Sequence, residues 1–213
     1  MRHAVKCPKL HIVRKSSFKA TPWKNGGGIT HEAIRVPASG DPFRWRVSVA
    51  QIDVSGPFSD FAAYNRKMVL LRGAGIELRF ANGEKTTLRQ VGELVEFDGA
   101  VSTYCELLAG PCVDLNLMVS KSGKVDVRVE RLREPLSVSA SFNESTLVFC
   151  IDDSVVLESD TGESVTLAPW DLAVLSRCSG RLSRFESGNS SAPPHVFLAT
   201  LVPPDEGLVS GEV

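Results

Sequence analysis

The segment Thr21–Gly28 concentrates residue types that could hold a small anion. It reads Thr-Pro-Trp-Lys-Asn-Gly-Gly-Gly. Three consecutive glycines allow sharp turns and a close approach of backbone N–H groups to a ligand. Trp23 adds an apolar surface, Lys24 a positive charge and Asn25 an amide. The same segment is also compatible with a glycine turn between two strands, in which Trp23 closes one end of a core.

A second cation lies inside an apolar pattern. Within Trp45–Ala50, Arg46 and Ser48 alternate with apolar side chains. Successive side chains of a strand point to opposite faces, so Arg46 and Ser48 share one face while Trp45 and the two valines share the other. A small, polar and cationic face favours a ligand over a core. Trp45 itself also suits a barrel core, as does Phe58, because aromatic side chains dominate such interiors.

The elements that must position these residues are short strands. Ile76–Phe80 alternates apolar and charged side chains, and Asn82-Gly83 behind it is a strong hairpin signal. Leu115–Val119 and Val125–Val129 alternate as well, and no window shows a convincing helical stripe. The sequence therefore predicts an all-β chain.

The strands repeat along the chain at an offset of 79 positions, so that residues 66–119 match residues 145–198 without a gap. The turn glycine Gly83 falls on Gly162. The offset also places apolar strands on apolar strands: Met68–Leu71 on Leu147–Cys150, and Leu117 and Val119 on Val196 and Leu198. Two copies of one antiparallel unit predict two barrels with the same strand order.

A corner that follows the third strand of each copy resembles the second motif of the cupin barrel. These corners are Gln90–Glu93 and Pro169–Asp171. The resemblance implies a bicupin, which is a pair of jelly-roll barrels. We expect an N-terminal barrel over residues 1–122, which carries the ligand pocket, and a C-terminal barrel over 123–213.

A set of motifs in the first third of the chain carries a family resemblance: Pro22–Gly28, Thr30, Trp45–Ala50, Gly56–Ser59, Phe61, Arg66 and Leu70–Gly75. In order and spacing they resemble the HutD/Ves family, whose proteins are linked to bacterial histidine utilisation or to stress response. Ala62-Ala63 and Asn65 depart from the family's usual Pro-Gly and Asp. The resemblance implies a bicupin that binds a small molecule and assists histidine breakdown, with N-formylglutamate or urocanate as suggested ligands.

Alternation and family resemblance together predict one ligand site at the mouth of the N-terminal barrel. Lys24, Arg46 and Arg66 are cations from three separate stretches, and a bound anion would relieve their mutual repulsion. Arginine suits a carboxylate because its fork binds both oxygens. The predicted site consists of Trp23, Lys24, Asn25, Gly26, Trp45, Arg46, Ser48, Phe58 and Arg66.

We expect this site to hold no metal and no other cofactor. Cupin enzymes bind metal through two histidines and a carboxylate of the first motif and a histidine of the second. Asp60, Ala62, Arg66 and Val95 stand at those positions, or Ser59 and Phe61 replace the first two if the spacing is one residue longer. Such a set cannot complete a transition-metal site.

A binding protein is therefore the leading hypothesis. The alternative is a metal-independent enzyme, as some cupin isomerases and epimerases are, which needs a general base within reach of the substrate. Candidate bases in the first barrel are Tyr64, Tyr104, Asp60 and Glu93.

The composition limits the kinds of partner and the cellular location that we expect for this chain. The chain has 213 residues with 43% hydrophobic and 23% charged residues and a net charge of −1, so nothing indicates a nucleic-acid partner. No segment is apolar enough to span a membrane, and the N-terminal residues lack the apolar core of a signal peptide. Five scattered cysteines predict reduced thiols. We expect a cytoplasmic monomer or homodimer.

Overall fold

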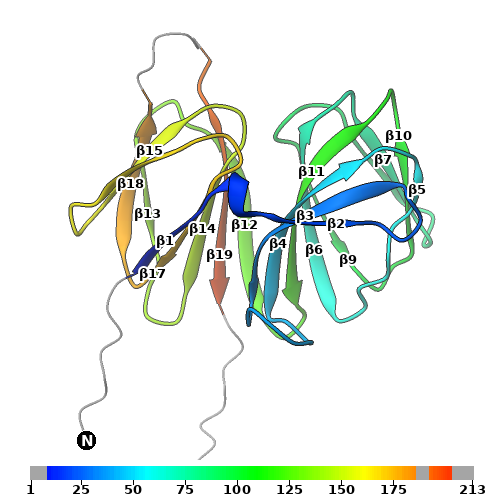
Figure 1. Cartoon of the computed structure of the whole chain (residues 1–213), viewed down its shortest axis with the longest axis horizontal. Coiled ribbons are helices and arrows are strands. Elements are labelled where there is room, and N and C mark those ends of the chain that lie inside the picture. Colours follow the sequence, from blue (N-terminus) through cyan, green and yellow to red (C-terminus); the bar gives the residue numbers. More distant parts are fainter. Residues whose placement is uncertain (1–8, 186–191, 203–213) are drawn as a thin grey trace, which may run out of the picture.

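The computed structural model describes residues 9–185 and 192–202, and in these ranges the chain is all-β apart from a short 3-10 turn, η1 (Lys15–Ser17). The strands form two cupin-like halves that lie side by side (Figure 1), which confirms the predicted fold class. None of the described segments is a helix long and apolar enough to cross a membrane.

The N-terminal half pairs a six-stranded sheet with a four-stranded one. The large sheet has the order β2 (Lys19–Pro22), β3 (Gly28–Val36), β4 (Trp45–Ile52), β11 (Cys112–Ser120), β6 (Tyr64–Arg72) and β9 (Leu94–Asp98). The small sheet has the order β5 (Gly56–Pro57), β10 (Thr103–Leu107), β7 (Ile76–Phe80) and β8 (Lys85–Leu88).

The C-terminal half repeats this arrangement. Its large sheet has the order β1 (Lys9–Val13), β17 (Leu172–Ser176), β14 (Ser145–Cys150), β19 (His195–Val202) and β12 (Lys124–Arg131). Its small sheet has the order β13 (Leu136–Ser139), β18 (Ser179–Arg184), β15 (Val155–Ser159) and β16 (Ser164–Leu167). The orders β4-β11-β6-β9 and β12-β19-β14-β17 correspond, so the predicted repeat of strand order is confirmed.

The ungapped offset of 79 holds for the β7–β8 hairpin only. Ile76 pairs with Leu88, and Val155 pairs with Leu167, at that spacing. Met68, however, faces the interior of its own half, as Val148 does, whereas Leu147 faces the other half. The equivalent of Met68 is therefore Val148 and not Leu147. A slip of one residue turns every side chain of a strand to the opposite face, so apolar matching alone did not reveal it.

The offset also fails for the last strands of the repeat. Asn116 pairs with Met68, and Leu198 pairs with Val148, so Leu198 is the equivalent of Asn116. The predicted matches of Leu117 with Val196 and of Val119 with Leu198 are wrong. The loops between strands differ in length in the two halves, and loop length changes without altering strand order.

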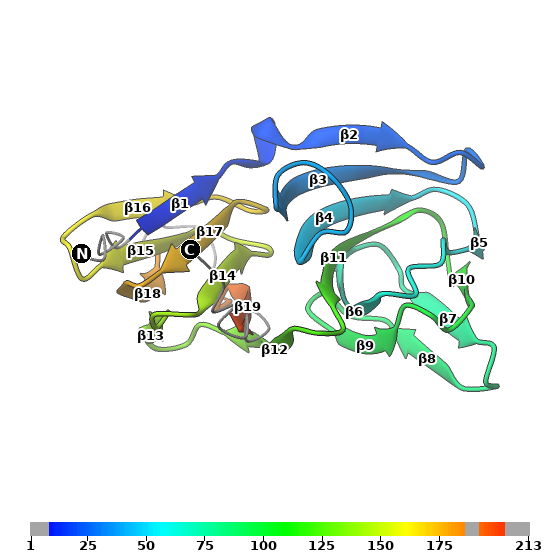
Figure 2. The same cartoon turned by 90° about the horizontal axis from the view of Figure 1, so that it is seen from below.

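The predicted first barrel over residues 1–122 needs a correction at its start. Strand β1 pairs along its whole length with β17, so it belongs to the large sheet of the C-terminal half (Figure 2). Leu10 and Ile12 pack against that half's interior core. The strand covers an edge of β17 that would otherwise offer unpaired backbone groups to solvent. At the other boundary, β11 ends at Ser120 and β12 begins at Lys124.

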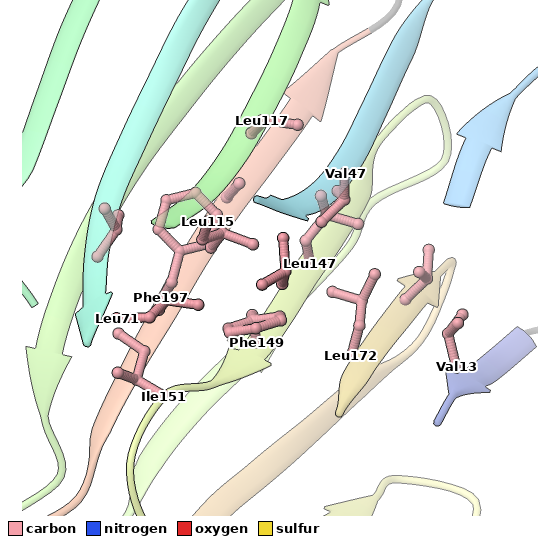
Figure 3. Close-up of a cluster of buried hydrophobic side chains, with 14 of the residues drawn as sticks. Val13, Val47, Leu71, Leu115, Leu117, Leu147, Phe149, Ile151, Leu172 and Phe197 are labelled. Carbon is pink, nitrogen blue, oxygen red and sulfur yellow. The ribbon is translucent and has the colours of Figure 1, made fainter. Parts of the chain in front are cut away.

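The largest buried cluster lies between the two halves rather than inside either of them (Figure 3). Both large sheets contribute one apolar face to it, and Trp45 packs against it. Because this face of β4 is committed to the other half, Arg46 and Ser48 must face the interior of their own half. The cluster includes Val47, Val49, Leu115, Leu117, Leu147, Phe149 and Phe197.

Candidate functional site

A cavity of about 590 Å³ lies in the N-terminal half, against β3, β4, β6 and β11 and beneath the loop that follows β2. Seven of the nine predicted site residues line it: Trp23, Lys24, Asn25, Arg46, Ser48, Phe58 and Arg66.

The other two predicted residues do not line the cavity. Trp45 lies on the apolar face of β4 and packs between the two halves. Gly26 has a φ of 71° and donates its N–H to the carbonyl of Trp23 at 3.0 Å, so its backbone serves the turn. The N–H of Gly27 donates to Oδ1 of Asn25 at 3.0 Å. The expected cradle of bare glycine N–H groups is therefore wrong at both glycines.

The glycine loop instead positions Trp23. The indole Nε1 donates to Oγ1 of Thr30 at 2.8 Å, and the ring meets Phe58 edge to face with centroids 6.2 Å apart. A Cβ on Gly28 would lie 2.2 Å from the carbonyl oxygen of Gln51 and 3.3 Å from the Trp23 ring. Glycine at position 28 thus allows the loop to approach β4 closely and bring Trp23 to the cavity.

Arg66 on β6 is the most deeply buried cation of the cavity, with 6% of its surface exposed. Its guanidinium lies 5.0 Å from the ring centres of Phe58 and Phe97 and 5.7 Å from that of Phe61. Burial lowers the pKa of Arg66 to about 10, against the opposing effect of Asp114, so the side chain remains charged at neutral pH. Its Nε has no hydrogen-bond partner among the described residues.

Arg46 on β4 approaches the same space from a neighbouring strand. Its Nη2 lies 3.3 Å from Sδ of Met118, and its guanidinium lies 5.2 Å from the ring centre of Phe61. Burial lowers its pKa, and Glu32 partly opposes that shift. Nε of Arg46 is also without a hydrogen-bond partner in the part of the chain that the structure describes.

Two cavity residues on β11, Asp114 and Asn116, are missing from the site predicted from the sequence. They are 2% and 4% exposed, and Oδ1 of each lacks a hydrogen-bond partner within the described ranges. Burial raises the pKa of Asp114 to about 7, although Arg66 and the Asn116 amide both lower it. The sequence does contain a signal for these two residues. Asp114 and Asn116 alternate with apolar residues along their strand, which is the same pattern that indicates Arg46 and Ser48.

Lys24 and the candidate catalytic bases lie away from the buried end of the cavity. Lys24 lines its rim and is exposed. Tyr64 is buried, and its hydroxyl accepts the N–H of Phe43 at 3.1 Å. Asp60 and Tyr104 are exposed, and Glu93 accepts backbone N–H groups in its own corner. None of these four candidate bases lines the cavity.

The equivalent positions of the C-terminal half carry apolar side chains that cannot hydrogen-bond a ligand. Val196 and Leu198 stand where the first half has Asp114 and Asn116, and both belong to the apolar interior core. Across residues 9–185 and 192–202, no group of three or more His, Cys, Asp or Glu is placed to hold a metal ion.

Two solved structures are similar to this chain in both fold and sequence, and a third in fold alone. A conserved protein of unknown function, PA5104 from Pseudomonas aeruginosa PAO1, has a TM-score of 0.81 at 30% identity over 91% of this chain and 99% of its own. HutD from Pseudomonas fluorescens SBW25, described in a formate condition, has a TM-score of 0.76 at 27% identity over 92% and 99%. An oxalate decarboxylase from Lactobacillus farciminis, at 8% identity and a TM-score of 0.61, shares the fold alone.

Relatives known from sequence agree. A 21.2 kDa protein from the hutC 3' region of Pseudomonas putida is 38% identical over 52% of this chain and 58% of its own length. Protein Ves of Escherichia fergusonii is 33% identical over 50% and 56%. The matched segments thus span little more than half of these two relatives. A model of the HutD family matches residues 15–191, which is most of the sequence. The cavity, its two arginines and the paired cupin-like halves are therefore features of a chain that belongs to the HutD family.

Proposed function

We propose that the cavity binds a small carboxylate of histidine degradation, N-formylglutamate or urocanate, and that the protein acts as a non-enzymatic accessory or regulatory factor in the cytoplasm. One observation carries the proposal. Arg66 is a buried cation and Arg46 a partly buried one in the same cavity, and each has a buried Nε without a hydrogen-bond partner within the described ranges. A buried donor without a partner is costly, and a carboxylate supplies charge-assisted partners for two guanidinium groups.

The relatives support the ligand class. The Pseudomonas putida relative comes from the region of hutC, and a family structure from Pseudomonas fluorescens was obtained in a formate condition. Trp23, Phe58 and Phe61 offer apolar surfaces on which the carbon skeleton of such a ligand can pack.

Calorimetric titration with N-formylglutamate and with urocanate tests the proposal. We expect one of them to bind with one site per chain, and glycerol, as a neutral polar control, to show no heat of binding. If neither carboxylate binds, the ligand assignment is wrong.

One observation favours an enzyme as a second candidate function. Asp114 is a cavity carboxyl whose pKa is raised to about 7 by burial, which suits a general acid or base at neutral pH. Incubating the protein with each metabolite and following product formation separates the two functions. Conversion that Asp114→Asn abolishes would favour the enzyme, and binding without conversion would favour the accessory role.

A further inference from the structure

The buried end of the cavity contains acceptors as well as donors. Asp114 and Asn116 lie two residues apart on β11 and face the same way, and each presents an Oδ1 that no described donor reaches. A carboxylate ligand alone would satisfy Arg66 and Arg46 but would leave these oxygens without partners. Each unsatisfied buried acceptor is costly, so a ligand that supplies a hydrogen at this point gains binding free energy that a plain carboxylate cannot.

The backbones that carry the donors and the acceptors lie at different positions along the strands. In the strand register, Met118 of β11 lies between Arg46 and Arg66, whereas Asp114 lies between Ala50 and Leu70. Four residues of extended strand separate the backbones of Met118 and Asp114 by roughly 13 Å. The Arg66 charge nevertheless shifts the pKa of Asp114, so the long arginine side chain brings its guanidinium toward the acceptors. A ligand that serves both groups must therefore carry a carboxylate and a hydrogen-bond donor within one small molecule.

Arg66 does not satisfy the acceptors itself. No ion pair within 4.0 Å joins it to Asp114 among the described residues, and its guanidinium instead lies against the rings of Phe58, Phe61 and Phe97. These aromatic contacts hold the Arg66 guanidinium near the two acceptor oxygens without forming a hydrogen bond to either of them. The Oδ1 atoms of Asp114 and Asn116 therefore remain available to a hydrogen-bond donor of a ligand.

We propose that Asp114 and Asn116 are specificity-determining residues that select small carboxylates which also carry an N–H group, in an amide or an azole. This inference rests on the proposed binding function and names the residues that recognise the N–H of its ligands. It predicts discrimination by a single N–H, because a site built to bond a hydrogen strongly rejects an analogue that lacks it.

The test compares ligands that differ at that hydrogen. N-formylglutamate is titrated against 2-(formyloxy)glutarate, in which an ester oxygen replaces the N–H. Urocanate is titrated against 3-(oxazol-4-yl)acrylate, in which a ring oxygen replaces the N–H and the other ring nitrogen is kept. We expect the analogue of the ligand that binds to bind wild-type protein at least tenfold more weakly.

Two near-isosteric variants then assign the effect to the named residues. Asn116→Leu and Asp114→Leu remove the acceptors, and each should reduce the tenfold preference to about twofold, while the N–H-free analogue binds as well as before. Asn143→Leu, at an exposed turn position of the other half, is the matched control and should keep the full preference. Should a leucine variant fail to fold, Asn116→Ala and Asp114→Ala replace it, since alanine also lacks an acceptor.

The outcomes separate this inference from the proposed function. Equal binding of a ligand and its N–H-free analogue to wild-type protein would overturn the selectivity and leave carboxylate binding intact. A preference that persists in both acceptor variants would also overturn it, because the N–H would then be recognised elsewhere. If no carboxylate binds at all, both proposals are wrong.

Discussion

Arg66 and Asp114 lie on neighbouring strands inside one cavity, both almost fully buried, yet no ion pair within 4.0 Å joins them in the described part of the chain. Each side chain still shifts the pKa of the other toward the charged form, while burial acts more strongly in the opposite direction. Buried opposite charges that do not pair directly are costly to the fold. A ligand bound between the two charges would offset part of that cost. We therefore expect the residues that bind the ligand to lower the stability of the ligand-free protein.

Removing either cavity arginine should weaken ligand binding. Arg66→Ala and Arg46→Ala should each cost about 2 kcal/mol or more of binding free energy, the scale for losing a charge-assisted contact in a desolvated site. Lys24→Ala should cost less, because Lys24 is exposed at the rim. Calorimetric titration measures all three, and Arg79→Ala, on the exposed face of β7, is the control. Equal affinity in all three cavity variants would place the ligand elsewhere.

The same arginine should limit stability. Arg66→Met replaces a buried cation that lacks an ion-pair partner within the described ranges by an apolar side chain of similar length. We expect the variant to lose ligand binding and to unfold at a temperature equal to or higher than that of the wild type, since well-packed apolar replacements of buried charges are often stabilising. Thermal unfolding by circular dichroism measures it. A marked drop in Tm would mean that the contacts with Phe58 and Phe97 hold the fold together.

Asp114 should make stability depend on pH. Its pKa in the folded protein is raised to about 7 by burial, against about 4 in an unfolded chain. Between these values the folded state retains a proton that the unfolded state has released, so stability falls as pH rises through this window. Asp114→Asn should therefore raise Tm more at pH 8 than at pH 5.

The charges around Asp114 do not reverse this sign. Arg66 on β6 favours ionisation, but burial outweighs it, and the Cys105 thiol on β10 has its own pKa raised to about 12. Asp60→Asn, at an exposed position, is the control and should change Tm equally at both pH values. A stabilisation by Asp114→Asn that does not vary with pH would contradict the prediction.

Gly28 should be intolerant of any side chain. Gly28→Ala would place a methyl group 2.2 Å from the carbonyl oxygen of Gln51 and displace the loop that carries Trp23. We expect a loss of about 1–3 kcal/mol in the free energy of unfolding, the usual cost of overpacking. Ligand affinity should fall as well. Urea unfolding and calorimetry measure the two effects. Gly26→Asn is the matched control: position 26 has a positive φ that asparagine tolerates and open space around its Cβ.

Asp171 should link the start of the chain to the C-terminal half. Its carboxylate accepts the N–H of Lys15 at 2.9 Å and that of Ala168 at 3.1 Å, and pairs with Arg14 at 2.7 Å. Asp171→Ala should lower the free energy of unfolding by about 1–3 kcal/mol, because it removes the hydrogen bonds and the ion pair that the buried carboxylate accepts. Glu93→Ala removes the equivalent corner carboxylate, which among the described residues accepts only the N–H groups of Arg89 and Gln90 within its own corner. A larger loss in the free energy of unfolding for Glu93→Ala than for Asp171→Ala would contradict the prediction that Asp171 stabilises the contact with residues 14–15.

Sequence by itself determined the kinds of strand and their order. Alternation is local, because a strand turns successive side chains to opposite faces whatever it packs against. Alternation alone therefore assigned Arg46 and Ser48 to one face and Trp45 to the other. The repeat likewise predicted two halves of equal strand order, since each half needs the same pairings to bury its apolar faces. The family motifs over residues 21–75 predicted the loop and the arginines that line the cavity.

Only the tertiary structure decided which face each strand buries and against what. Alternation distinguishes two faces but does not say which is the interior, so apolar matching pairs Met68 with Leu147 instead of Val148. The family motif includes Trp45 in the predicted site, but its face of β4 packs against the other half. Asp114 and Asn116 join Arg66 through pairing of β11 with β6, a contact between segments far apart in the chain. Strand β1 crosses to the other half because β17 offers an unpaired edge. Such contacts depend on the whole folded chain, and no short stretch of sequence carries them.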